Sequence, residues 1–194
     1  MKLVLIRHGR TRANEEMLYC GSTDLPISPG GLAELREKRA RGGYPDPAGF
    51  HIYTSGMLRT EQTLQALFGE LPHDVIRDLR EIDFGDFEMR GYTELQNDAA
   101  YRAWCEGDNE AKAAPGGESG TMVLERALRG LGMLLRRNED ALVITHGGIT
   151  SAVMGQLCPK AQRNRYDWMA DNGEGYCIEF ADGQAQRWEK LPVL

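Results

Sequence analysis

The chain has 194 residues, of which 41% are hydrophobic and 27% charged, and its formal net charge is −6. This length and balance predict one globular domain over residues 1–194, with enough apolar side chains for a sizeable core. The acidic charge argues against a nucleic-acid or membrane surface, so an anionic ligand would have to be bound by a local cluster of arginines.

The cysteines and the N-terminus indicate the cellular compartment. Four cysteines lie far apart and form no Cys-x-x-Cys pair: Cys20, Cys105, Cys158 and Cys177. Reduced thiols and a cytoplasmic location are therefore expected, with neither a zinc site nor a disulfide. The apolar run at residues 3–6 ends at Arg7, and it is too short for a signal peptide or a membrane span.

Short apolar runs alternate with helical patterns along the chain. The runs predict strands at residues 3–6, 51–54, 75–76, 141–145 and 176–180, with a further edge strand at 185–189. Helices are predicted at 57–71, from an N-cap at Ser119 to Arg137, and from just after His146. This alternation predicts an α/β fold, a three-layer α/β/α sandwich with a mostly parallel central sheet.

One stretch, residues 83–114, fits this alternation poorly. It carries Tyr92, Tyr101 and Trp104 at helical spacings and predicts a small helical cap inserted into the domain. The Pro/Gly-rich residues 42–49 predict a loop.

Two predicted strands end in the same way. Residues 3–6 lead into Arg7-His8-Gly9, and residues 141–145 lead into His146-Gly147-Gly148. In open α/β sheets, ligands bind beyond the carboxyl ends of the strands, and glycine lets a ligand approach the backbone. A histidine that only caps a strand is the alternative for either one alone, and a zinc pair would need further ligands. The matching pair favours a catalytic site, whereas His51 and His73 are predicted to be structural or surface residues.

Arginines accompany these histidines. Arg7 adjoins His8, and Arg59 is predicted in the first turn of the helix after strand 51–54. A cation is unfavourable at a helix N-terminus, and a bound dianion would remove that conflict. Arginine also binds phosphate oxygens in a bidentate manner. A surface salt bridge is the alternative for Arg59.

Four segments in this order resemble the histidine phosphatase superfamily, the clan of cofactor-dependent phosphoglycerate mutase and its phosphatase relatives. They are Arg7-His8-Gly9-Arg10-Thr11-Arg12-Ala13-Asn14, residues 55–63, residues 81–88, and Thr145-His146-Gly147-Gly148. The sequence departs from the pattern at Arg10, where the family often has Glu, at Thr60, where it often has Ala, and at Phe87, where it often has Trp. None of these departures removes a catalytic group.

The resemblance implies a role for each matching residue in a metal-independent phosphate transfer without a cofactor. His8 would accept the phosphate, which would be held by Arg7, Arg59 and His146, with Asn14 and the Gly147 N–H as further donors. Gly21 and Ser22 would contact the substrate beyond its phosphate. For the proton donor to the leaving group, the residues alone leave Glu81, Asp83, Asp86 and Glu88 open, and the resemblance selects Glu81.

The expected partner is a small-molecule phosphate ester, and a homodimer is left open. Residues 84–90, 101–105 and 115–119 are similar to the α-ribazole phosphatases within this family, which suggests α-ribazole 5′-phosphate as the substrate. Tyr101, Trp104 and Arg90 would either stack on an aromatic base or pack the cap. Arg10 and Arg12 indicate a substrate with more than one acidic group.

Two other functions stay open. One is a phosphoglycerate mutase-type phosphotransferase, although 194 residues leave little room for the mutases' usual insertion and tail. The other is a non-catalytic protein that binds phosphorylated metabolites. The presence of the whole residue set argues against this second alternative.

Overall fold

The computed structural model describes residues 1–108, 110–158 and 165–192. In this part of the chain, six strands form one sheet: β1 (Lys2–Arg7), β2 (His51–Thr54), β3 (Asp74–Val75), β4 (Ala141–Thr145), β5 (Gly175–Ala181) and β6 (Gln184–Leu191). The α-helices are α1 (Arg12–Glu15), α2 (Pro29–Arg41), α3 (Leu58–Phe68), α4 (Tyr92–Leu95), α5 (Ala99–Glu106), α6 (Gly120–Arg137) and α7 (Gly147–Leu157). Short 3-10 turns are η1 (Arg77–Leu79), η2 (Gly85–Phe87) and η4 (Arg165–Trp168).

The sheet has the order β3-β2-β4-β1-β5-β6. The β3–β2, β2–β4 and β4–β1 pairs are parallel, whereas β5 runs antiparallel to β1 and β6 antiparallel to β5. The predicted mostly parallel α/β sheet is therefore confirmed, with an antiparallel pair at one edge. Parallel pairing of β1 with β4 places Arg7 opposite Thr145, so the carboxyl ends of both strands lie together.

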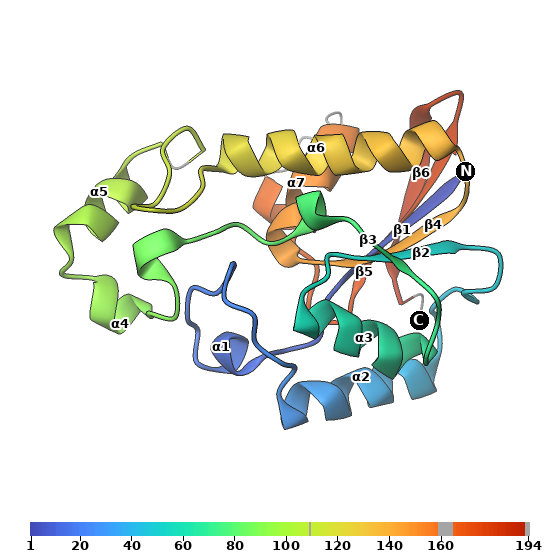
Figure 1. Ribbon diagram of the computed structural model, residues 1–194, viewed down its shortest axis with the longest axis horizontal. Coiled ribbons are helices and arrows are strands. Elements are labelled where there is room, and N and C mark those ends of the chain that lie inside the picture. The colour runs from blue at the N-terminus through green and yellow to red at the C-terminus, as the bar shows by residue number, and fades with distance from the viewer. Residues whose placement is uncertain (109, 159–164, 193–194) are drawn as a thin grey trace.

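Two helical layers cover the sheet, as Figure 1 shows, with α6 and α7 on one face and α2 and α3 on the other. The side chains of β1 alternate between these layers, because successive residues of a strand point to opposite faces. Leu3 and Leu5 join the core under α6 and α7, while Val4 and Ile6 join the core under α2 and α3. This alternation explains why β1 is a continuous apolar run.

Helix α2 was not among the sequence predictions. Its first turn, Pro29-Gly30-Gly31, is typical of a loop, and its apolar side chains are few among charged ones. The Ser28 side chain nevertheless caps the helix by accepting a hydrogen bond from the Gly31 N–H at 3.0 Å. Helix α3 is shorter than predicted, because the chain leaves it at Gly69 with φ of 89°. Strand β3 lies one residue earlier than predicted.

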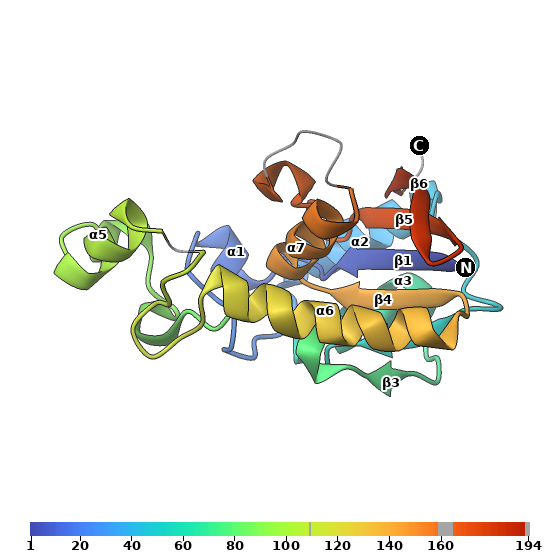
Figure 2. The same ribbon diagram turned by 90° about the horizontal axis from the view of Figure 1, so that it is seen from above.

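The cap extends away from the sheet, and α4 and α5 lie far from the strands in both Figures 1 and 2. Tyr101 and Trp104 are only 6% and 7% exposed, and with Phe87 they form a small core of the cap, against which Tyr19 and Phe84 pack. These two rings therefore pack the cap and are not free to stack on a base.

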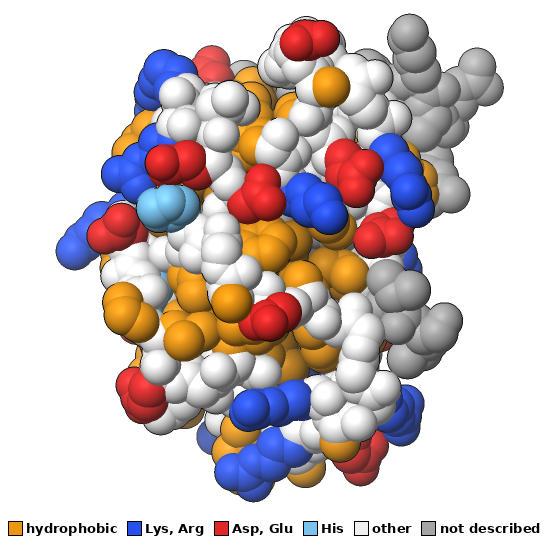
Figure 3. Space-filling model, turned by 90° about the vertical axis from the view of Figure 1, so that its right-hand side faces the viewer, with side chains coloured by type: hydrophobic (Ala, Val, Ile, Leu, Met, Phe, Trp, Pro, Cys, Tyr) orange, Lys and Arg blue, Asp and Glu red, His pale blue; other side chains and the backbone are white. Residues whose placement is uncertain are grey.

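The opposite end of the molecule is shown in Figure 3, where lysines, arginines and acidic side chains surround an apolar area. No helix among residues 1–108, 110–158 and 165–192 is long and apolar enough to cross a membrane.

Candidate active site

The two strand-end histidines lie next to each other. His8 follows β1 and His146 follows β4, and their ring centroids are 5.1 Å apart. Both side chains are buried, with exposed fractions of 5% and 0%. Parallel pairing of adjacent strands thus brings together two residues that are far apart in sequence.

The His8 ring has a defined tautomer. Its Nδ1 lies 2.7 Å from the Gly9 carbonyl oxygen, which can only accept a hydrogen bond, so Nδ1 carries the proton. The lone pair is then on Nε2. Burial and the charge of Arg59 hold the pKa of His8 well below its usual range, against the opposing effect of the Gly9 bond. A neutral imidazole with a free Nε2 lone pair is a competent nucleophile.

Arg7 and Arg59 supply the positive charge. Arg59 lies in the first turn of α3, is 1% exposed, and donates to the carbonyls of Gly21 at 2.7 Å and Thr23 at 3.0 Å. Arg7 donates from Nη1 to the Ala170 carbonyl at 2.8 Å, but its buried Nε has no hydrogen-bond partner among the described residues. An unpaired buried donor is costly, and a bound anion would satisfy it.

His146 precedes the first turn of α7 and leaves a second unpaired atom. Its Nε2 lies 2.8 Å from Ser55 Oγ, whereas the buried Nδ1 has no partner in the described part of the chain. A Cβ added at Gly147 would lie 3.1 Å from Arg7 Nε, so the start of α7 lies against Arg7. A helix N-terminus beside these two unpaired nitrogens is suited to an anion such as phosphate.

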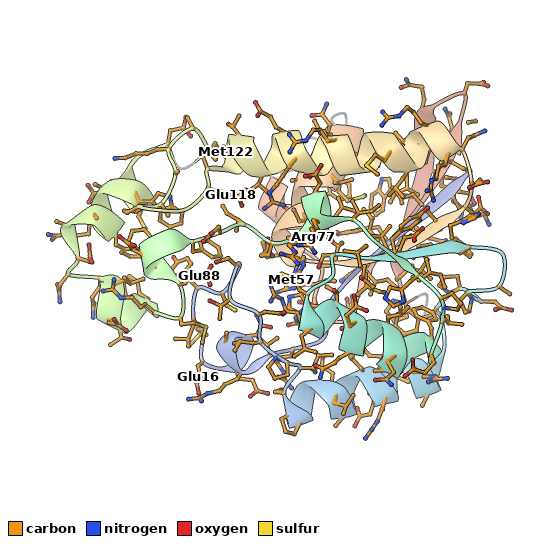
Figure 4. The ribbon with its side chains drawn as sticks, in the orientation of Figure 1. Glu16, Met57, Arg77, Glu88, Glu118 and Met122 are labelled. Atoms are coloured by element: carbon orange, nitrogen blue, oxygen red, sulfur yellow. The ribbon has the colours of Figure 1, made fainter. Side chains whose placement is uncertain are left out.

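The Glu81 side chain lies beside the first turn of α7. Its Oε2 accepts a hydrogen bond from the Gly148 N–H at 3.1 Å, and its Oε1 accepts one from the Ile82 N–H at 3.0 Å. Glu81 also lines a cavity of about 290 Å³, together with Ser22, Met57, Arg77, Arg80, Asp83, Glu118 and Arg126. Figure 4 labels Met57, Arg77 and Glu118 of this lining. The cavity is large enough for the leaving group of a small ester.

The other acidic candidates have different surroundings. Asp83 accepts from Ser22 Oγ at 2.9 Å and from the Gly85 N–H at 2.8 Å, while Asp86 is exposed. Glu88 accepts the N–H groups of residues 21–23 and 84. Only Glu81 contacts the first turn of α7, which places it beside the candidate anion site.

Gly21 and Ser22 lie in a loop that contacts Arg59 on one side and Asp83 on the other. The Gly21 carbonyl accepts from Arg59, and a Cβ added at Gly21 would lie 1.5 Å from the Ile82 carbonyl oxygen. Only glycine therefore fits this contact. Asn14 accepts with Oδ1 from the Thr11 N–H at 3.0 Å, which leaves its Nδ2 as the side that can donate to a ligand.

The remaining charged candidates do not join the site. Arg10 pairs with Glu34 at 3.2 Å and Arg12 with Glu16 at 2.7 Å. Both arginines are therefore ion-paired in the structure, and the second acidic group of the substrate that they indicated stays a prediction. His51 pairs with Glu139 at 3.2 Å and His73 with Glu61 at 2.7 Å, away from His8 and His146.

Comparisons with known proteins decide the family. The sequence pattern of the Histidine phosphatase superfamily (branch 1) matches residues 3–190. The chain belongs to the histidine phosphatase superfamily. An Adenosylcobalamin/alpha-ribazole phosphatase of Escherichia coli (strain K12) is 28% identical over 100% of this chain and 95% of that protein. The structure of the alpha-ribazole phosphatase from Shigella flexneri has a TM-score of 0.84 and 27% identity, and covers 95% of this chain and 93% of that one.

Mutases also resemble this member of the superfamily. A 2,3-bisphosphoglycerate-dependent phosphoglycerate mutase of Bradyrhizobium diazoefficiens is 34% identical over 65% of this chain and 64% of that protein.

Three residues that contact the candidate site residues were not predicted from sequence. Ser55 contacts His146, and Asn172 donates to the His8 carbonyl at 3.0 Å. Arg126 of α6 donates to the Glu81 carbonyl at 2.9 Å and to Glu118 at 2.7 Å, which fixes the segment carrying Glu81. Ser55 lies in a recognised motif, but Arg126 and Asn172 carry no sequence signal, because their partners are distant in the chain.

The free protein is expected to lose stability as the pH falls below about 6.5, the value of an ordinary histidine. Burial, followed by the charge of Arg59, lowers the pKa of both His8 and His146, so the unfolded chain binds protons that the folded chain resists. Their contribution is complete above that pH. Below it, each histidine lowers the free energy of unfolding by about 1.4 kcal/mol per pH unit, down to its own folded pKa.

Urea unfolding of the wild type and of His146→Gln, from about pH 7.5 to about pH 5, measures this slope. His73→Gln is the control, and it should change the pH slope of the free energy of unfolding in the opposite direction. The reason is that a hydrogen bond to the Leu71 carbonyl and the nearby Glu61 raise the pKa of His73. Equal slopes for wild type and His146→Gln would contradict the assignment of a neutral buried His146.

Glu88→Ala is expected to lower the free energy of unfolding by about 2 kcal/mol, because backbone N–H groups would lose their acceptor. Burial opposes the charge on Glu88, yet hydrogen bonds from Thr23, Phe84, Ser22 and Gly21 keep its pKa below the usual range. The loop of Gly21 and Ser22 would loosen, so KM should also rise. Glu94→Ala is the matched control, since Glu94 is exposed and its carboxylate pairs with Arg90. The same loss in both variants would refute this role for Glu88.

Proposed function

We propose that the chain is a phosphomonoesterase that hydrolyses a small phosphate ester through a phosphohistidine on His8. The observation that carries this proposal is the position of the His8 Nε2 lone pair in a buried site with two unpaired nitrogens, Arg7 Nε and His146 Nδ1. A phosphoryl group would accept a hydrogen bond from Arg7 Nε, and one from His146 Nδ1 once that ring is protonated, while its phosphorus faces the nucleophile.

The reaction then proceeds in two steps. His8 Nε2 attacks phosphorus, the bond from phosphorus to the leaving oxygen breaks, and Glu81 gives its proton to that oxygen. In the second step, water attacks phosphorus and gives a proton to Glu81, the bond from phosphorus to His8 Nε2 breaks, and phosphate leaves. Arg7, Arg59, His146 and the Gly147 N–H stabilise the charge on the equatorial oxygens, so the proposal needs no metal ion.

The proposed substrate is α-ribazole 5′-phosphate. The support is the similarity to the Escherichia coli and Shigella flexneri phosphatases, which extends over nearly the whole chain. Because Tyr101 and Trp104 are buried in the cap, recognition of the base would fall to the cavity beside Glu81.

A second candidate substrate class has its own support in the cavity. Arg77 and Arg80 line it, and neither forms an ion pair among the described residues. Three nearby carboxylates have other partners: Asp78 pairs with Arg129, Glu118 pairs with Arg126, and Asp83 accepts from Ser22. Two such cations favour an ester whose leaving group carries a carboxylate, such as 3-phosphoglycerate, which releases glycerate. A mutase-type transfer would use the same site.

A turnover screen with EDTA present tests the proposal. It compares p-nitrophenyl phosphate, α-ribazole 5′-phosphate, 3-phosphoglycerate and glycerol 3-phosphate. Hydrolysis that survives EDTA supports the phosphohistidine enzyme, and the preferred ester names the substrate. Inactivity on all four esters would instead favour a protein that only binds phosphorylated metabolites. The cytoplasmic location and the homodimer stay predictions.

A further inference from the structure

Two buried hydroxyl groups connect His146 to the start of α3. Ser55 follows β2 and Thr60 lies in the first turn of α3, and both are 0% exposed. Ser55 Oγ lies 2.8 Å from His146 Nε2 and 3.2 Å from Thr60 Oγ1. Thr60 Oγ1 lies 2.7 Å from the Met57 carbonyl oxygen, where the chain of contacts ends.

The donor of each hydrogen bond between His146 and the Met57 carbonyl can be assigned in turn. A carbonyl oxygen only accepts, so the single hydroxyl proton of Thr60 goes to Met57. The contact between the two hydroxyls therefore needs the proton of Ser55. Ser55 Oγ then has no proton left for His146, so the His146 Nε2–H must donate to it. Ser55 also accepts the Met57 N–H at 3.4 Å, so both hydroxyl groups donate and accept hydrogen bonds.

This assignment fixes the tautomer of neutral His146. The proton is on Nε2, and the lone pair is on Nδ1, the buried atom with no partner among the described residues. A nitrogen lone pair repels the oxygen of a phosphate dianion. Nδ1 can donate to such an anion only after the ring has gained a second proton.

We propose that Thr60 is a positioning residue that fixes the His146 tautomer, so that binding of a phosphate-like dianion requires uptake of a proton at His146 Nδ1. That this proton uptake accompanies substrate binding during turnover rests on the proposed function, whereas the tautomer of ligand-free His146 does not. Without the Thr60 hydroxyl, Ser55 loses its acceptor and turns its proton to His146 Nε2. The ring proton then moves to Nδ1, and His146 can donate to the anion without taking up another proton.

The charges around His146 agree with proton uptake on binding. Four groups on neighbouring elements act on its charge: Arg59 of α3, His8 after β1, Arg126 of α6, and Arg7 at the end of β1. Burial and then these groups, Arg59 first, hold the pKa of His146 well below its usual range. A bound dianion would offset these positive charges and favour the imidazolium.

The first test is ¹⁵N NMR of the histidine rings in ligand-free protein near neutral pH, with the His146 signals assigned by His146→Gln. The wild type and Thr60→Ser, which keeps the hydroxyl, should show the Nε2–H tautomer of His146. The isosteric Thr60→Val should show the Nδ1–H tautomer. If Thr60→Val fails to fold, Thr60→Ala makes the same test. A Nδ1–H tautomer in the wild type, or no change in the variant, would overturn the proposal.

The second test is the affinity for tungstate, which stays a dianion from about pH 6 to about pH 8. In the wild type and Thr60→Ser, Kd should rise about tenfold per pH unit more steeply than in Thr60→Val, because one more proton is bound with the anion. Equal slopes in all three proteins would refute proton uptake at His146. Tungstate binding without ester hydrolysis would leave this inference standing and refute the proposed function, so the two failures can be told apart.

Discussion

Replacement of His8 by alanine should lower kcat by about four orders of magnitude or more. The reason is that Nε2 of His8 forms the covalent bond to phosphorus, and the arginines that bind the phosphate cannot replace a nucleophile. The variant should still bind tungstate, because Arg7, Arg59 and His146 remain. Turnover of p-nitrophenyl phosphate and tungstate affinity, measured on the same preparation, check both expectations.

His51→Ala is the matched control for this experiment. His51 is exposed and contacts Glu139, so its loss should leave turnover unchanged. An active His8→Ala protein would contradict the assignment of the nucleophile.

The second large effect is expected at Glu81. In Glu81→Gln, kcat on alkyl phosphates such as glycerol 3-phosphate should fall by about 10²–10⁴-fold, because an alkoxide leaves poorly without a proton. With p-nitrophenyl phosphate the leaving group needs no proton. His8 should then be phosphorylated rapidly, but hydrolysis of the phosphohistidine should be slow without the Glu81 base. Rapid mixing should show a burst of p-nitrophenolate followed by a slow steady state.

The control for Glu81→Gln is Asp86→Asn, because Asp86 is exposed and lies in the same segment. It should behave as the wild type with both esters. A burst in Asp83→Asn, together with none in Glu81→Gln, would move the acid–base role to Asp83, which also lines the cavity.

The strands and the two strand-end histidines were predictable from sequence for a physical reason. β1 and β4 are buried on both faces, so both are continuous apolar runs whose ends are clear. Helix α2 was missed because its buried side chains are few and its first turn contains two glycines. Short-range patterns describe elements that bury many of their own side chains, and α2 does not.

Contacts within the site were less predictable. The Ser55–His146 contact and the bonds of Arg126 to residues 78–81 join segments separated by 45 to 91 positions. The role of Trp104 was also open, because an aromatic residue at helical spacing can face either a ligand or a core. Only its packing against Phe87 and Tyr101 decides in favour of the cap core.

The central claim is the phosphohistidine, and it can be observed directly. The wild type is mixed with p-nitrophenyl phosphate in the presence of EDTA and quenched in base, in which phosphohistidine survives, and its peptides are analysed by mass spectrometry. We predict phosphate on the peptide that contains His8, as the Nε2 isomer, because Nδ1–H is bonded to the Gly9 carbonyl. Phosphate on another residue, or steady turnover with no phosphopeptide and no loss of rate in His8→Ala, would contradict the account.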